Sequence, residues 1–339
     1  MYDVAIIGAG INGSSVAYEL VKSGKSVIIF DKEAIASGGS GAAGAFISPK
    51  FSKAGELKAL IDKAFVYSMK FYEENFPYLF AKAPLQHITH EGEKFPLMDA
   101  GIVSASAMCD ALCKGAKFKQ EKISDLVYED DYWVLNETYS AKHVVIATGA
   151  YEHIIKEPYI KLRGVWGHRI DVKTSTINDK SLHQFVSISP SKDGIVAIGA
   201  THNLDYHPQT ATKPYDVEEG RVELLEKASR MLELKDVEIV KDYMGLRSGS
   251  FDYMPLLGRL VLSQATLGCC ERKVKVKKPD FKNFLYYPKL YMINGNGGYG
   301  FVLAPYLAKM LCRHIVAGVK LDDALSPARF FARWAKRRK

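Results

Sequence analysis

The sequence is poor in cysteine and has no long apolar run, and each shortage excludes a class of protein. Its five cysteines in 339 residues are an odd number at irregular spacing, unlike a disulfide framework. Cys109 and Cys113 lie one helical turn apart, but no second cysteine or histidine pair completes a zinc site. We therefore expect free, buried thiols and no metal. Without a run of about eighteen apolar residues or the basic start of a signal peptide, the sequence predicts no membrane span and a cytoplasmic location.

Acidic residues are outnumbered, and the excess of positive charge is unevenly distributed. The net charge is +8, and the pI is near 9.0. The segment Arg272–Lys282 holds six basic residues and one acid, Asp280. The tail Arg329–Lys339 holds six basic residues and no acid. Such segments are often only solvated surface, but two of them favour a polyanionic partner.

The chain opens with the pattern of a dinucleotide-binding unit. Gly8, Gly10 and Gly13 form GxGxxG between an apolar strand and a helix. The first glycine permits a tight turn, the second lets the backbone approach a pyrophosphate, and the third lets the helix pack on the strand. The pyrophosphate would then lie at the positive end of the helix. Asp31 ends the next strand, where a carboxylate accepts hydrogen bonds from both ribose hydroxyls and disfavours a 2′-phosphate.

Two later segments, Val144–Gly149 and Asn294–Gly300, favour FAD over NAD as the expected ligand. Val144–Gly149 (VVIATG) is a buried strand ending in a turn of small residues, although a plain core strand would look the same. Ser37–Ala45 consists only of Ser, Gly and Ala, and these small side chains let the backbone of the loop approach a ligand closely. Asn294–Gly300 (NGNGGYG) precedes a helix whose N-terminal dipole would stabilise the negative charge of a reduced flavin.

Elements of the nucleotide-binding fold recur late in the chain, which indicates a discontinuous domain. We predict an α/β protein with a Rossmann-like FAD-binding domain and an α+β substrate domain built on an antiparallel sheet. The FAD-binding domain is expected over residues 1–50, 100–165 and 245–339, and the substrate domain over 51–99 and 166–244. The other expected elements are helices over Leu57–Phe76, Gly101–Leu112 (with a lead-in turn), Val217–Leu232 and Ala304–Ala317, strands over Ser124–Val134 and Gly164–Ala200, and an irregular basic segment over Val261–Tyr287.

These motifs together resemble the D-amino-acid-oxidase-like FAD-dependent oxidoreductases, the group that contains glycine oxidase and sarcosine oxidase. The resemblance covers essentially the whole chain and includes GLRSGSFDYMPLLG at Gly245–Gly258. Within this group the sequence is most similar to the oxidase half of the bifunctional tRNA-modifying MnmC family. The segments that carry this closer similarity are GAFISPKFSK (Gly44–Lys53), LRGVWGH (Leu162–His168), IGATHNLDY (Ile198–Tyr206) and the C-terminal LSPARFFARWAKRR.

The resemblance implies a reaction and a set of site residues. The carboxymethyl group of 5-carboxymethylaminomethyl(-2-thio)uridine at the tRNA wobble position would be oxidised and released as glyoxylate, and the reduced flavin would be reoxidised by oxygen. Arg247 matches the position that clamps the substrate carboxylate, and Lys53 matches a lysine that faces substrate or helps to activate oxygen. The tRNA would be bound through the two basic segments. Matching FAD-binding positions are Gly8, Gly10, Gly13, Asp31, Lys32, Ser37, Gly38, Gly44, Ala147, Thr148, Gly149, Gly295, Gly297, Gly298, Tyr299 and Gly300.

Several alternatives stay open beside this interpretation. The loops that attach flavin covalently in some relatives lack the matching Cys or His here, so non-covalent FAD is expected. MnmC proteins carry a methyltransferase ahead of the oxidase, so another protein is expected to supply that step. His168 and His202 either contact the nucleic acid or are ordinary histidines. The rival functions are a small-molecule amine or amino-acid oxidase and an FAD-binding protein that has lost catalysis.

Overall fold

The expected N-terminal βαβ unit is present and forms the centre of a parallel sheet. In the computed structural model, which describes residues 1–151 and 154–338, it consists of β1 (Tyr2–Ile7), α1 (Ile11–Lys22) and β2 (Val27–Asp31). Four consecutive residues of each strand are buried, because helices or strands cover both faces of the sheet. This burial explains why the two strands are apolar throughout and do not alternate.

The large sheet has the strand order β16-β17-β10-β1-β2-β7, and the β8–β9 hairpin extends it from β10. Strands β17, β10, β1, β2 and β7 are parallel, and β16 joins β17 in the antiparallel sense. The additional strands are β7 (Lys117–Gln120), β8 (Leu126–Glu129), β9 (Tyr132–Leu135), β10 (Tyr139–Ile146), β16 (Leu256–Val261) and β17 (Tyr286–Asn294). This sheet therefore combines segments from the beginning, middle and end of the chain.

A second sheet of six strands is almost entirely antiparallel, with the order β15-β11-β14-β13-β12-β5. Its strands are β5 (Leu85–His87), β11 (Leu162–Lys173), β12 (Ser181–His183), β13 (Ser187–Ile188), β14 (Ile195–Gly199) and β15 (Glu238–Ser250). Helix α4 (Val217–Ser229) packs on it through Leu224 and Ala228. A third, three-stranded antiparallel sheet contains β3 (Phe46–Ile47), β6 (Gly101–Val103) and β4 (Phe80–Lys82). The structure confirms the predicted α/β fold with a separate antiparallel sheet.

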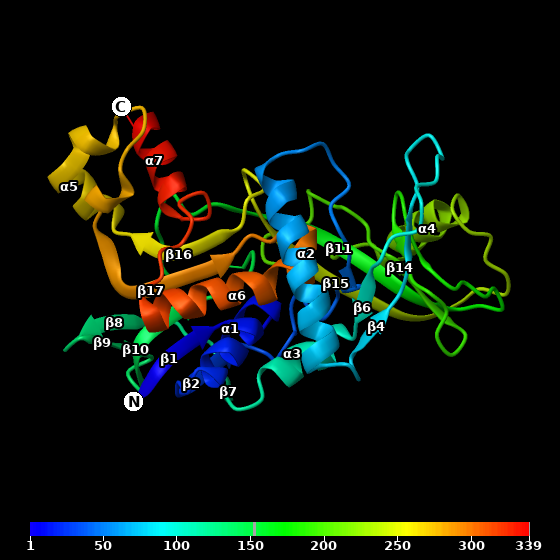
Figure 1. The fold of residues 1–339 in the computed structure, drawn as a ribbon, viewed down its shortest axis with the longest axis horizontal. Helices are drawn as coiled ribbons and strands as arrows, with labels where there is room; N and C mark the ends of the chain where they lie inside the picture. The colour runs from blue at the N-terminus through cyan, green and yellow to red at the C-terminus, as the bar shows by residue number, and fades with distance from the viewer. Residues whose placement is uncertain (152–153, 339) are drawn as a thin grey trace.

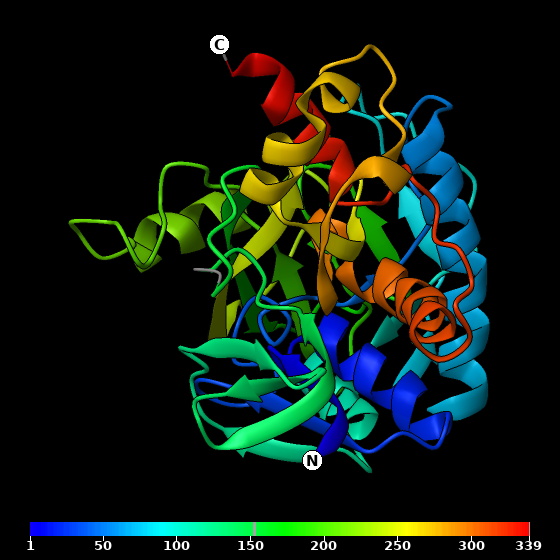
Figure 2. The same cartoon turned by 90° about the vertical axis from the view of Figure 1, so that its left-hand side faces the viewer.

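The remaining helices cover the parallel sheet. They are α2 (Glu56–Asn75), α3 (Ala105–Leu112), α5 (Ser263–Val274), α6 (Gly300–Ala317) and α7 (Ala328–Arg337), with short 3-10 helices η1 (Phe281–Asn283) and η2 (Gly297–Tyr299). Helices α1, α2 and α6 pack together in one apolar core on one face. Helices α5 and α7 lie side by side at one end of the molecule, and α4 lies at the other (Figures 1 and 2). The predicted domain boundaries place α2 in the substrate domain, whereas in the structure α2 packs on α6. The boundaries themselves stay a prediction.

Three expectations about secondary structure are wrong, and one about burial fails at Cys269. The segment expected to be irregular contains α5, which the sequence conceals because only three of its twelve residues are buried and Cys270 interrupts it with φ −136°. Helix α6 begins at Gly300, four residues earlier than expected, because its glycine-rich start has low helix propensity. Residues 101–103 form strand β6 instead of a lead-in turn. All five cysteines are free, but Cys269 is exposed.

One described segment is long and apolar enough to cross a membrane by length and composition. It is Gly297–Ala317, with a mean hydropathy of 1.2, and half of it is buried within the protein. Its apolar side chains contact α1 and α2 in the main core. The composition of α6 is accounted for by its position as a core helix between these two neighbours.

Candidate functional site

A cavity lies where the carboxyl ends of the parallel strands meet the antiparallel sheet. Its volume is about 550 Å³. The turns after β1, β2, β10 and β17 line one side, and β11, β12 and β15 line the other. In open α/β sheets, ligands bind at this edge because the strand ends leave a crevice there. The cavity therefore brings the nucleotide-binding motifs and the antiparallel sheet to one site.

The glycine motif provides the close packing that its spacing predicts. Gly8 has φ +105°, and a Cβ there would lie 2.4 Å from the carbonyl oxygen of Ala147. A Cβ on Gly13 would lie 1.9 Å from the oxygen of Gly8, so α1 contacts the turn directly. Ser40 accepts a hydrogen bond from the N–H of Ile11 at 2.9 Å, through its hydroxyl oxygen. The first turn of α1 therefore faces the cavity at the end of the helix that favours an anion.

Asp31 lies at the end of β2, within the lining of the cavity. One carboxylate oxygen accepts the N–H of Ala9 at 2.9 Å. The other accepts the N–H of Glu33 at 3.2 Å and the hydroxyl of Ser37 at 3.3 Å. These donors hold the carboxylate beside the glycine turn, and its remaining lone pairs suit the ribose hydroxyls of a dinucleotide. Lys32, also in the lining, lies 4.7 Å from the centre of the Tyr151 ring.

A second helix N-terminus points at the same cavity. Residues 297–300 of η2 and α6 line it, and the side chain of Asn296 donates to Asn12 at 2.7 Å. The other side-chain atom of Asn296, its oxygen Oδ1, is buried without a hydrogen-bond partner among the described residues. Asn294 donates to the carbonyl oxygen of Gly149 at 2.9 Å, which ties this loop to the turn after β10. Two helix dipoles, close-packed glycines and a buried acceptor fit a bound dinucleotide with a reducible ring.

Arg247 lies on β15 and lines the cavity from the antiparallel sheet. Its guanidinium packs closely against Gly167 of β11, where a Cβ would be only 2.5 Å from Nη2. It donates one hydrogen bond, to the carbonyl oxygen of Thr201 at 2.8 Å, and burial lowers its pKa. Within residues 1–151 and 154–338, no carboxylate pairs with it. A partly buried guanidinium without an anionic partner among the described residues suits an anionic ligand.

Arg169, on the neighbouring strand β11, also lines the cavity but is already engaged. It donates to Asp171 at 3.0 Å and stacks on the Tyr243 ring, 3.8 Å from its centre. Its Nε is buried without a hydrogen-bond partner in the described part of the chain. The sequence interpretation missed Arg169, although it directly follows the LRGVWGH segment. Ser40 and Asn296 were also not singled out, although both lie in loops that the sequence marks as ligand-binding.

Aromatic rings line another part of the cavity wall. Phe51, His183 and Phe185 are in the lining. Phe51 stacks on His87 with centroids 4.1 Å apart and an interplanar angle of 4°. Burial, aided by the nearby His87, lowers the pKa of His183 to about 4, so this ring is neutral near pH 7. The wall offers flat, mostly uncharged faces to a planar group.

Most of the other predicted site residues line the cavity, and a few do not. Lys53 is exposed and does not line the cavity, and Gly13 and Gly295 lie behind the lining. The remaining predicted FAD-binding residues all line the cavity. His168 is fully buried and contacts Asp242 at 2.8 Å, which makes it a core residue, whereas His202 is exposed.

The two basic segments form one surface, because α5 and α7 pack against each other. Lys336 donates to the carbonyl oxygen of Lys277 at 2.9 Å across this contact. Their exposed basic residues are Arg272, Lys273, Lys275, Lys277, Lys278, Lys282, Arg333, Lys336, Arg337 and Arg338. Lys339, also in the predicted tail, lies outside the described residues. We call this set the α5–α7 basic surface.

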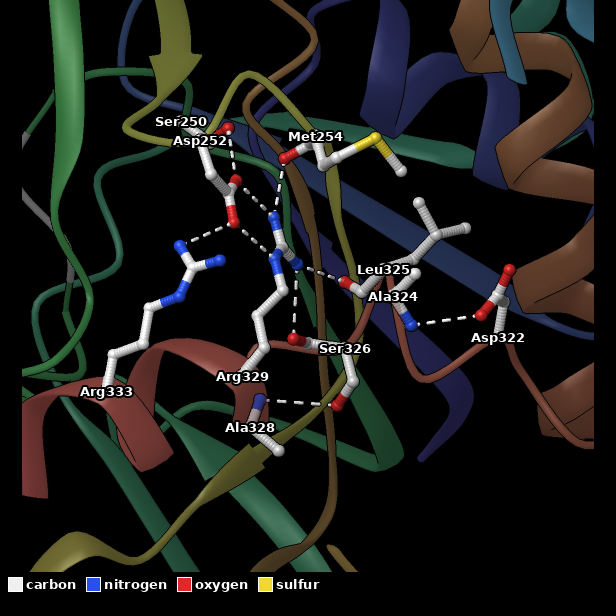
Figure 3. A network of polar contacts seen from close by, with 10 residues as sticks. All are labelled: Ser250, Asp252, Met254, Asp322, Ala324, Leu325, Ser326, Ala328, Arg329 and Arg333. Carbon is white, nitrogen blue, oxygen red and sulfur yellow. Dashed lines mark hydrogen bonds and ion pairs between the residues drawn. The ribbon is translucent and has the colours of Figure 1, made fainter. Parts of the chain in front are cut away.

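Arg329, the first residue of the predicted basic tail, does not belong to this surface. It is 9% exposed and pairs with Asp252 through two hydrogen bonds of 2.9 Å (Figure 3). It also donates to the backbone oxygens of Leu325, Ser326 and Met254. These contacts use its planar array of donors within the protein. Although it belongs to the basic tail, Arg329 therefore has a structural role, in which it fixes the start of α7 to the loop that contains Asp252.

Comparison with known proteins agrees with the site. The DAO family, described as FAD dependent oxidoreductases, matches residues 3–96 and 92–314. The tRNA 5-methylaminomethyl-2-thiouridine biosynthesis bifunctional protein MnmC of Maricaulis maris is 26% identical, over 98% of this chain and 56% of that protein. Glycine oxidase of Bacillus subtilis is 24% identical, over 76% of this chain and 84% of that protein. The chain thus spans little more than half the length of the MnmC relative.

Solved structures share the fold at low sequence identity. Glycine oxidase from Geobacillus kaustophilus superimposes with a TM-score of 0.72 at 20% identity, over 97% of this chain and 98% of that one. L-proline dehydrogenase from P. horikoshii gives the same TM-score at 15% identity, over 97% of both chains. Because the family match covers most of the chain and the cavity residues fit a dinucleotide, the chain belongs to the DAO family of FAD-dependent oxidoreductases, with FAD as its cofactor.

Proposed function

We propose that this enzyme oxidises the carboxymethylaminomethyl group of a wobble uridine, or its 2-thio form, in tRNA. Water and the oxidised cofactor would convert the glycine-like secondary amine to the aminomethyl nucleoside and glyoxylate. Similarity to MnmC proteins over 98% and 97% of the chain supports this substrate. We expect the enzyme in the cytoplasm, where it would meet tRNA.

The observation that supports a glycine-like substrate is the partly buried guanidinium of Arg247 in the cavity wall. The substrate's carboxylate distinguishes it from its aminomethyl product and is the natural group for the enzyme to hold. A carboxylate buried without a cation is costly, and a guanidinium binds both of its oxygens in one plane. Arg247 faces the cavity and has no carboxylate partner among the described residues. In this proposal it fixes the orientation of the carbon that is oxidised.

The rest of the cavity supplies binding and orientation. Bound FAD supplies the acceptor for the two electrons removed from the carbon next to the carboxylate. Residues 297–300 would hold the cofactor at the N-terminus of α6, and the glycine turn with Asp31 would hold its nucleotide part. Phe51 and Phe185 offer faces for the planar uracil ring. Orientation of this kind accounts for a large part of enzymatic rate enhancement.

A tRNA substrate is favoured over a free amino acid by the α5–α7 basic surface. Two segments separated in sequence pack together and leave ten described lysine and arginine side chains exposed. A small substrate has no use for this concentration of positive charge, whereas a polyanion releases counterions on binding to it. The small-molecule oxidase is therefore the second candidate, supported by the glycine oxidase relatives.

Mass spectrometry of nucleosides tests the proposal directly. tRNA that carries the carboxymethylaminomethyl group is incubated with the purified protein, digested and compared with untreated tRNA. We expect the aminomethyl nucleoside to replace the substrate nucleoside, with one glyoxylate formed per conversion. Glycine and sarcosine are assayed in parallel with the same protein. Oxidation of these amines without any change in the tRNA would establish the small-molecule alternative.

A further inference from the structure

Two large aromatic side chains stand in solvent beside the active-site cavity. Phe251 is 55% exposed and Tyr253 is 64% exposed, in the loop between β15 and β16. Tyr253 has φ +64°, a left-handed conformation that is unusual for a residue with a bulky side chain. An exposed aromatic pair on a strained backbone has no role in the core, so its position requires an explanation from its surroundings.

The loop is held in this conformation by Asp252, which lies between Phe251 and Tyr253 in the sequence. Its carboxylate turns inward to Arg329 and accepts a further hydrogen bond from Arg333 at 2.9 Å (Figure 3). The hydroxyl of Ser250 donates to it at 3.2 Å. Burial alone would raise the pKa of Asp252, but the hydrogen bonds and charge of Arg329, with the charge of Arg333, lower it. Because Asp252 is fixed inward, the side chains on either side of it remain outside.

The aromatic pair is continuous with the cavity. Phe251 lines a shallow depression of about 430 Å³ that shares Tyr151 and Gln209 with the active-site cavity. Arg163, on the adjacent strand β11, lies 5.9 Å from the ring of Phe251 and 5.6 Å from the ring of Tyr253. A molecule that extends out of the cavity on this side would therefore meet two rings and a guanidinium.

The described charged residues that line this depression or contact the rings from outside the loop are basic. Lys161 lines the same depression and is exposed, and the side chain of Arg333 is 58% exposed. The only acid of the loop, Asp252, is already paired with two arginines. Arg333 also belongs to the α5–α7 basic surface, so the positive charge continues from the cavity edge along α7. Flat rings between cations are the features that bind single-stranded nucleic acid.

We propose that Phe251 and Tyr253 form a stacking platform for the nucleotides next to the modified uridine, with Arg163 and Lys161 contacting their phosphates. This inference rests on the proposed tRNA substrate. For its side chain to enter the cavity, the wobble base must leave the stack of the anticodon loop, and its neighbours then lose a stacking partner. The two rings replace that partner, and every base has a face that can stack on them.

Binding of an anticodon stem-loop tests the platform. A fluorescent stem-loop is titrated with the holoenzyme and with Phe251→Ser, Tyr253→Ser and the double variant, at fixed salt. We expect the dissociation constant to rise by about fivefold or more for each ring removed. The matched control is Tyr78→Ser, because Tyr78 is 68% exposed and does not line the cavity. Phe251→Trp should retain the affinity, since tryptophan also stacks.

Turnover gives a second measurement and separates the two proposals. The double variant should raise KM for the stem-loop and leave its oxidation of a free N-substituted glycine and its FAD content unchanged. If the wild type binds and oxidises the stem-loop but the double variant does so with equal affinity, the platform is refuted. If the wild type neither binds nor oxidises tRNA, the proposed function itself fails.

Discussion

Replacement of Arg247 by methionine should slow substrate oxidation by about a hundredfold while the fold and the FAD content are preserved. Among the described residues, this guanidinium makes one hydrogen bond, to the oxygen of Thr201 at 2.8 Å. Methionine fills similar space, so the loss falls mainly on the substrate, whose carboxylate would be buried without a cation. A hydrogen-bonded charge pair contributes about 1.5–3 kcal/mol, and the upper value corresponds to a factor of about 100 in rate.

The assay is the anaerobic bleaching of the flavin absorbance after rapid mixing with substrate. It reports the oxidation step alone, without reoxidation. Arg247→Lys should restore only part of the rate, because an ammonium cannot hold both carboxylate oxygens in one plane. Arg169→Met is the matched comparison: Arg169 lines the same cavity but is paired with Asp171, so we expect a smaller loss. An Arg247→Met enzyme that bleaches at the wild-type rate would show that another group holds the carboxylate.

Three further predictions follow from the contacts of single groups. Asp31→Asn keeps an acceptor for the N–H of Ala9 but removes the negative charge. The affinity for FAD, measured by fluorescence quenching, should therefore fall about tenfold to a hundredfold. An unchanged affinity would contradict the contact between Asp31 and the ribose. Arg329→Met breaks a buried pair and should lower the free energy of unfolding in urea by about 3 kcal/mol. Because the folded-state pKa of Asp252 is lowered, the loss of unfolding free energy in Arg329→Met should be complete above the unfolded pKa near 4 and should shrink as pH falls through the folded pKa. A loss that does not depend on pH would exclude the ion pair as its cause. Neutralising the three basic residues at 336–338 with glutamine should flatten the salt dependence of tRNA binding by about 0.7–0.9 per lost contact, and an unaltered slope would remove α7 from the binding surface.

The features that the sequence predicts well are local. GxGxxG demands its geometry within six residues, since Gly8 has a positive φ and Gly13 touches Gly8. The buried strands of the parallel sheet are recognisable because both of their faces are apolar. Each of these signals depends on backbone conformation or burial of neighbouring residues, so no knowledge of distant contacts is needed.

The features that the sequence conceals depend on distant contacts. Helix α5 has a weak apolar pattern, and its packing against α7 supplies the order that its own residues do not indicate. Lys53 belongs to a segment that is similar to relatives, yet its side chain is exposed away from the cavity. Arg169 reaches the cavity because β11 crosses beside β15, a pairing between residues about eighty positions apart. Residue type alone does not distinguish these positions.

Arg329 shows what this distinction means for function. From the sequence alone, Arg329 adds one more positive charge to the basic tail that would bind a polyanion. In the structure, Asp252, 77 residues earlier, pairs with this charge inside the protein, so it is not available at the surface. The same pair ties the start of α7 to the loop that carries Phe251 and Tyr253. The remaining cations of α7 are therefore held in fixed relation to the edge of the cavity. If tRNA binds as proposed, with its backbone on α7 and its bases on this loop, the two elements would move as one unit. Positioning of the wobble base would then depend on Arg329, a residue that contacts neither the backbone nor the bases.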